Sequence, residues 1–112
     1  MRYVMNSPVL SAFGDYTYRE LTIDEAQAWL DEDTYRPKIQ YKKTVDLFNM
    51  AFDGHTIIVD PRWIRMNAGD EALVFRENRR LRRQEKQDGL TKDAIVKIAR
   101  IGLLKMTNKE SH

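Results

Sequence analysis

Apolar positions in the first third of the chain follow the two spacings that distinguish strands from helices. Residues 2–5 and 16–21 have the composition of strands. From Thr22 onward the spacing becomes helical, and Glu25 lies three residues after Thr22, which predicts a capping box. Acidic residues 31–33 lie at the negative end of this helix, so we expect that end to fray. The predicted helix has one apolar face, formed by Ile23, Ala26, Trp29 and Leu30.

Two further helices are predicted in the rest of the chain. Pro37 predicts a break before a helix over about residues 41–52, and Gly54 predicts its left-handed cap. Residues 55–59 have strand composition. Thr91 predicts the start of a third helix and Gly102 its end, and residues 103–107 then form a closing strand.

Between these helices, the pattern over residues 63–75 predicts a β-hairpin. Residues 63–66 have strand character, and 72–75 form a continuous apolar run, typical of a strand covered on both faces. Residues 67–70 contain the Asn, Gly and Asp of a turn. The whole pattern predicts an α/β fold, a mixed sheet of about five strands flanked by about three helices. We expect one domain over residues 1–107 and a polar tail over 108–112.

The composition is that of a soluble globular protein, with 42% hydrophobic and 32% charged residues. The net charge is only +2, but residues 1–37 hold seven acidic and three basic side chains, whereas six of the eleven residues 76–86 are basic. This asymmetry favours a local anion site over general coating of nucleic acid. The absence of cysteine excludes disulfides and thiolate metal sites. No run approaches the roughly 20 apolar residues of a membrane span, so we expect no membrane partner and a cytoplasmic location.

The strongest candidate for a ligand site is the group Arg79, Arg80, Arg82 and Arg83. Four guanidinium groups within five positions suit a phosphodiester, because each can donate two parallel hydrogen bonds to phosphate oxygens. The alternative interpretation is a solvated helix face or loop whose arginines pair with nearby glutamates.

Candidates outside the basic segment are weaker. Asn6 and Ser7 follow the first predicted strand and offer an amide and a hydroxyl to a ligand, although such a loop is commonly just a turn. His55 is a weak candidate for a general base because the reference pKa of histidine is about 6.5. It has no acidic partner at motif spacing, which favours a structural role. Acidic residues 31–33 fit a solvated helix end better than a cation site, so we expect no metal and no cofactor.

With these segments in view, the chain resembles the small viral ring nucleases of archaeal viruses, which serve as type III anti-CRISPR proteins. Residues 3–10 are similar to that family's opening strand and Asn-containing loop, residues 21–30 to its first helix, and residues 66–74 to its hairpin. Arg80-Leu81 falls on the family's Arg-Leu pair. The resemblance implies a homodimer that binds a cyclic oligoadenylate across its two-fold axis. Cleavage in that family is metal-independent, by attack of a ribose 2′-hydroxyl on the neighbouring phosphate.

The chain departs from this family at the positions that the resemblance marks as catalytic. The family's Gly-His at the start of the second helix corresponds to Gln40-Tyr41, and its acidic residue after Arg-Leu corresponds to Arg82 or Arg83. An arginine before the hairpin corresponds to Pro61, with Arg62 one place away. Tyrosine, with a reference pKa of about 10, is a poor proton acceptor at neutral pH, so Tyr41 is only a weak catalytic candidate.

We therefore expect a protein that sequesters a cyclic oligonucleotide messenger, or at most cleaves it slowly, to counter host defence. If it is active, it is a metal-independent cyclic oligoadenylate phosphodiesterase. The alternative is a small non-catalytic binding protein for DNA, RNA or a host protein. The expected ligand contacts come from polar, aromatic and basic side chains of three segments: Asn6, Ser7, Tyr41, Lys42, Arg62, Arg79, Arg80, Arg82 and Arg83.

Overall fold

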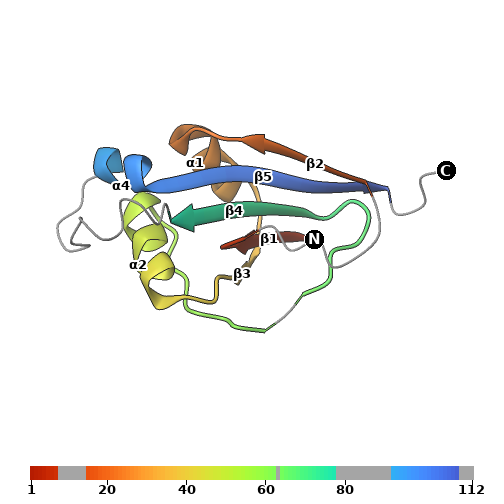
Figure 1. Cartoon of the computed structure of the whole chain (residues 1–112), viewed down its shortest axis with the longest axis horizontal. Helices are drawn as coiled ribbons and strands as arrows, with labels where there is room; N and C mark the ends of the chain where they lie inside the picture. Colours follow the sequence, from red (N-terminus) through yellow and green to blue (C-terminus); the bar gives the residue numbers. More distant parts are fainter. Residues whose placement is uncertain (8–14, 63, 78–91, 109–112) are drawn as a thin grey trace.

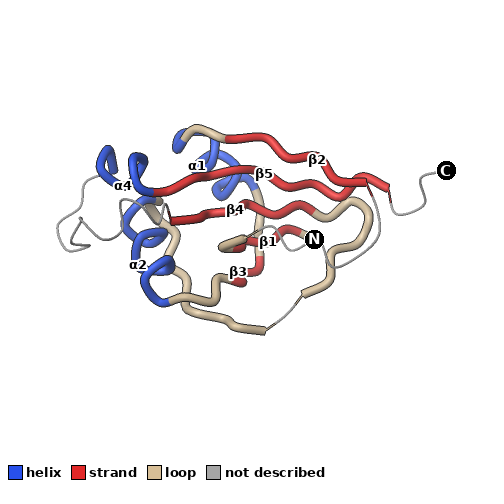
Figure 2. The backbone as a smooth tube through the Cα atoms, in the orientation of Figure 1, coloured by secondary structure: helices blue, strands red, loops and turns tan. Residues whose placement is uncertain are grey.

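A mixed five-stranded sheet runs through the molecule in the order β2-β5-β4-β1-β3 (Figure 2). The computed structural model describes residues 1–7, 15–62, 64–77 and 92–108. Strand β1 pairs in parallel with β3 and β4, whereas β5 pairs antiparallel with β4 and β2. The predicted α/β fold class is confirmed. The strands are β1 (Arg2–Met5), β2 (Asp15–Glu20), β3 (Arg36–Lys38), β4 (Glu71–Glu77) and β5 (Ala99–Asn108).

Helices pack on one face of this sheet (Figure 1). The other face is covered by the segment that contains Ile64 and Met66. The helices are α1 (Ile23–Glu32), α2 (Lys42–Ala51) and α4 (Lys92–Ile98). Phe75 of β4 meets Phe48 and Phe52 edge-on, with ring centroids 5.7 and 5.8 Å apart. On the opposite face Val74 packs with the buried side chain of Met66. The predicted burial of residues 72–75 on both faces is therefore confirmed.

The predicted capping box of the first helix is present at the start of α1. The Glu25 N–H donates to Thr22 Oγ1 at 3.1 Å, and the Thr22 N–H donates to Glu25 Oε1 at 2.9 Å. At its other end α1 extends to Glu32, within the acidic residues where fraying is expected. Arg2 of β1 donates to the carbonyl of Trp29 and, at 2.6 Å, to that of Asp33. A cation from a neighbouring strand thus satisfies the helix end.

The predicted hairpin is wrong in its first strand. Residues 64–66 form no strand, and Trp63 lies outside the described residues. The turn over residues 67–70 is present, with the Asp70 N–H donating to the Asn67 carbonyl at 2.9 Å and Gly69 at φ 92°. Strand β4 pairs instead with β1 and β5, and the side chain of Met66 is buried against the sheet without its backbone joining the ladder.

Three other predicted features differ from the structure. Residues 55–59 form no strand, because the backbone of Ile57 bonds to the Asn49 side chain at 2.8 and 3.1 Å. The break predicted at Pro37 is instead β3, an edge strand paired only with β1, where a residue without an N–H is tolerated.

The predicted stop at Gly102 is also wrong, since α4 ends at Ile98 and Gly102 lies inside β5. A Cβ on Gly102 would overlap the ring of Tyr18 from β2, which accounts for glycine inside a strand. Strand β5 continues to Asn108. The Thr91 cap and residues 109–112 of the tail lie outside the described residues.

Candidate ligand-binding site

Two parallel strands end side by side, and the polar residues after them come together. Met5, the last residue of β1, is in register with Lys38, the last residue of β3. Just beyond, Asn6 Oδ1 accepts a hydrogen bond from the Gln40 N–H at 3.1 Å. Ligand sites of α/β sheets commonly lie outside the carboxyl ends of parallel strands. The carboxyl ends of β1 and β3 are therefore the first place to look for a site.

A small pocket and a wider groove lie together at this edge. The pocket encloses about 20 Å³, enough for one water molecule, and the adjoining groove about 540 Å³ beside the edge strand β3. Lys38, Arg62 and Ile64 line both spaces. The pocket is also lined by Met5, Asn6, Ser7 and Gln40. The structure thus brings the predicted site residues Asn6, Ser7 and Arg62 together.

Asp60 holds the two cations of this pocket. Its Oδ1 accepts from Arg62 Nε at 3.0 Å, its Oδ2 from an Arg62 terminal nitrogen at 2.8 Å, and Oδ2 also from Lys38 Nζ at 3.0 Å. The hydrogen bonds from Arg62, followed by that from Lys38, hold the pKa of Asp60 far below its usual range. Two cations and one carboxylate leave one positive charge at the pocket wall.

The start of helix α2 lies next along the chain. Tyr41 is the N-cap, but its side chain makes no capping hydrogen bond, and the first turn contains no acidic residue. Free N–H groups at a helix start favour negative ligands. The Tyr41 side chain is 61% exposed, and Lys42 Nζ pairs with Asp46 one turn along α2. Thr44 Oγ1 donates to Glu77 Oε1, at the end of β4, at 3.0 Å.

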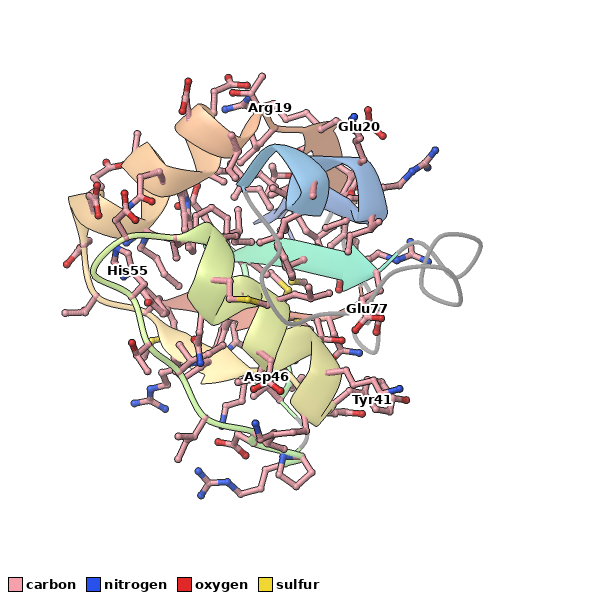
Figure 3. All side chains as sticks on the ribbon, turned by 90° about the vertical axis from the view of Figure 1, so that its left-hand side faces the viewer. Arg19, Glu20, Tyr41, Asp46, His55 and Glu77 are labelled. Atoms are coloured by element: carbon pink, nitrogen blue, oxygen red, sulfur yellow. The ribbon has the colours of Figure 1, made fainter. Side chains whose placement is uncertain are left out.

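His55 does not belong to this group. It lies past the far end of α2, about 15 Å along the axis of a ten-residue helix. In Figure 3 it is separated from Tyr41 by the length of α2. Its Nε2 lies 2.7 Å from Asp31 Oδ1 and its Nδ1 lies 2.8 Å from Tyr35 Oη. The bond to His55 lowers the pKa of Asp31, whereas burial raises that of Tyr35. Both ring nitrogens therefore contact α1 and the segment just after it from the loop after α2.

The four predicted arginines, Arg79, Arg80, Arg82 and Arg83, lie outside the described residues. Sequence reasoning missed Lys38, Gln40 and Asp60. The spacing of Asp60 and Arg62 could have indicated that they interact, since an aspartate can accept from the backbone N–H two residues later. Here Asp60 accepts from the Arg62 N–H at 3.1 Å. Lys38 and Gln40 carried none, because their positions depend on the pairing of β3 with β1.

No cluster of three or more metal-ligating side chains occurs within the described ranges. Among the helices in that part of the chain, none is long and apolar enough to cross a membrane. The site is therefore described by its amide, hydroxyl, aromatic and cationic groups.

The chain is similar to a known protein family and to solved structures. A family model described as STIV B116-like matches residues 2–102. Among solved structures, B116 of Sulfolobus turreted icosahedral virus is similar, with a TM-score of 0.70 and 18% identity over 93% of this chain and 97% of that chain. At this identity the structural match shows a shared fold. No curated protein sequence matches the chain.

Proposed function

The chain belongs to the STIV B116-like family, and we propose that it binds a cyclic oligonucleotide second messenger, with cyclic oligoadenylate as the first ligand to test. The proposal includes a viral origin, action in the host cytoplasm against host defence, and a homodimer whose two-fold axis carries the ring. Its support is the sequence resemblance to viral ring nucleases together with the polar pocket at the ends of β1 and β3.

The observation that carries the proposal is the placement of Asn6, Lys38, Gln40 and Arg62 around one pocket. Asn6 uses its carbonyl oxygen to accept from Gln40, so its amide nitrogen is left to donate to a ligand. The adjacent cations keep one positive charge in excess of Asp60. Phosphate oxygens accept hydrogen bonds from both kinds of donor.

Tyr41 offers an aromatic surface on which a base of the same ligand can stack, beside the proposed phosphate donors. Tyr41 follows Gln40 directly and is 61% exposed. Stacking of one base on an aromatic ring is worth about 1–3 kcal/mol. The basic residues Arg79, Arg80, Arg82 and Arg83 follow the end of β4 and complete the proposed set.

Sequestration is favoured over cleavage because the two catalytic candidates, Tyr41 and His55, are poorly placed or poorly suited to act as a general base. Tyr41 stands where the ring nucleases have histidine, and an ordinary phenol holds its proton at neutral pH. His55 is held by Asp31 and Tyr35 at the other end of α2. General acid–base assistance is typically worth about 10²–10⁴-fold, so without it any cleavage should be slow.

Calorimetric titration with cyclic di-, tri- and tetranucleotides tests the binding. Asn6→Asp is the sharpest variant, because it keeps the oxygen that accepts from Gln40 but replaces the free amide donor with negative charge. We expect it to weaken binding about ten-fold or more. Asn67→Asp makes the same change in the exposed turn at the other end of β4 and should bind normally. Absence of heat with every ligand at tens of micromolar protein would contradict the proposal.

Cleavage is tested separately by incubating labelled cyclic tetra-adenylate with excess protein. We expect the ligand to be recovered intact after release by heat. Rapid conversion to linear di-adenylate would overturn sequestration, and loss of that conversion in Tyr41→Phe or His55→Ala would then identify the base.

The salt dependence of binding separates this proposal from a DNA- or RNA-binding function. Long nucleic acid releases a counterion for nearly every phosphate contacted, so its affinity falls steeply with salt. A ring with few phosphates gives a shallower slope and a stoichiometry of one per dimer. A steep slope with long nucleic acid and no binding of rings would support the alternative.

A further inference from the structure

Two arginines face each other across neighbouring strands near the proposed pocket. Arg76 of β4 is in register with Arg100 of β5, and both side chains are exposed. Directly opposed residues of an antiparallel pair lie about 5 Å apart at Cα and project from the same face of the sheet. The two guanidinium groups therefore share one small region of the surface.

This region belongs to the sheet face that does not carry the helices. Side chains alternate along β4, so Arg76 lies on the face of Ala72 and Val74, which pack with Met66. Its neighbour Glu77 points to the helical face, where it accepts from Thr44. Helix α2 therefore does not cover the arginine pair.

The arginine pair lies at the same edge of the sheet as Asn6 and Ser7. Met5, where β1 ends, is in register with Val74, and β4 continues beyond it through Arg76 to Glu77. Figure 1 shows β4 and β5 extending past the end of β1 toward α2. A ligand seated at Asn6 thus has the arginine pair beside it on the projecting strands.

Like charges placed directly opposite each other on a sheet destabilise it unless something neutralises them. Within the described ranges, neither guanidinium forms an ion pair with a carboxylate. Glu20 of β2 is one candidate partner, since it is in register with Gly102, two residues from Arg100, yet no ion pair joins Glu20 to Arg100 in the described structure. An anion between the two arginines would remove the repulsion.

We propose that Arg76 and Arg100 together hold one phosphate of the bound oligonucleotide. This inference rests on the proposed function and deepens it by adding two contacts that the sequence pattern did not identify as a pair. Two guanidinium forks can each donate paired hydrogen bonds to the oxygens of one phosphate, a geometry that lysine or glutamine cannot reproduce.

The test measures affinity and stability in the full chain carrying Arg76→Gln, Arg100→Gln or both. With cyclic tetra-adenylate, each single variant should bind about ten-fold more weakly or worse, and the double variant only slightly worse than the singles, because both arginines serve one phosphate. Without ligand, each variant should unfold at the same or a higher temperature, since the repulsion is relieved. Arg19→Gln, in β2 and on the helical face, is the matched control and should bind normally.

Inorganic pyrophosphate provides a second probe that does not depend on the oligonucleotide. It should raise the unfolding temperature of the wild type and have a smaller effect on both single variants. Unchanged oligonucleotide affinity in Arg76→Gln and Arg100→Gln would overturn the arginine pair and leave the proposed function standing. If pyrophosphate stabilises the wild type through both arginines but no oligonucleotide binds, the two arginines form a phosphate site and the proposed function is overturned. A wild type that binds neither probe would overturn both.

Discussion

At the scale of single residues, Asp60 controls how much positive charge the pocket presents. It accepts from Arg62 and Lys38 at once, and these bonds fix the directions of two long side chains that would otherwise be mobile. The cations that are proposed to bind a phosphate are therefore already oriented before it enters. The same arrangement means that Asp60 competes with the ligand for both cations.

The first prediction concerns the pH dependence that Asp60 brings. Its pKa in the folded chain is lower than in the unfolded chain, so its bonds stabilise the fold above about pH 4 and are lost as pH falls below that value toward the folded pKa. Asp60→Asn should therefore unfold at a lower temperature than wild type at pH 7. The difference should shrink below about pH 4, as measured by thermal unfolding from pH 7 to pH 2.5. A gap that stays constant to pH 2.5 would contradict this role.

At the scale of elements, helix α1 depends on contacts at its two ends that differ in kind. Its start is held by the reciprocal bonds of Thr22 and Glu25, three residues apart, and its end by Arg2 from a distant strand. The guanidinium of Arg2 also lies 3.7 Å from the centre of the Trp29 ring, so the same side chain anchors the helix to β1.

Removing the cap at the start of α1 gives the second prediction. Thr22→Ala loses the oxygen that accepts from the Glu25 N–H and should reduce the free energy of unfolding by about 1 kcal/mol. Thr22→Ser keeps the acceptor and should stay close to wild type. Chemical denaturation measures both, and equal losses in the two variants would show that the hydroxyl is not the source of the stability.

The third prediction concerns the attachment of α2 to the sheet. Phe75 is fully buried against Phe48 and Phe52, so Phe75→Ala leaves a cavity and should cost about 3–5 kcal/mol of unfolding free energy. Phe75→Leu refills most of the volume and should cost less. Because Tyr41, the N-cap of α2, belongs to the proposed set of ligand contacts, the alanine variant should lose ligand affinity as well. Full stability in Phe75→Ala, measured by urea unfolding, would contradict this packing.

At the scale of the whole molecule, the proposed site is incomplete in a single chain if its ligand is a symmetric ring. Asn6, Lys38 and Arg62 form one polar wall at one edge of the sheet. A ring with two-fold symmetry would meet two such walls when two copies face each other at this edge. Isologous pairing of this kind is the commonest symmetry of soluble oligomers.

The fourth prediction is therefore a dimer that binds one ring. Light scattering at micromolar concentration should give about twice the 13.2 kDa mass of the chain, and calorimetry should give one cyclic tetra-adenylate per two chains. A monomeric mass across that range, or one ring for each chain, would contradict the two-fold site.

The sequence alone determined the features whose contacts lie within a few residues. The capping box joins Thr22 to Glu25, and the turn before β4 joins Asn67 to Asp70 through bonds of 2.8 and 2.9 Å. Such hydrogen bonds depend on side-chain type and spacing, which the sequence shows directly. The continuous apolar run in β4 likewise predicted burial on both faces, because burial follows from composition.

Only the tertiary structure decided which distant segments pair and which charges meet. Strand β4 pairs with β5, whose sequence lies more than twenty residues further along the chain, and not with the segment just before it. The edge strand that contains Pro37 is a strand because β1 pairs with it. Arg76 and Arg100 are brought together by the register of two strands far apart along the chain. Long-range pairing reflects the packing of the whole core, so no short sequence pattern could indicate it.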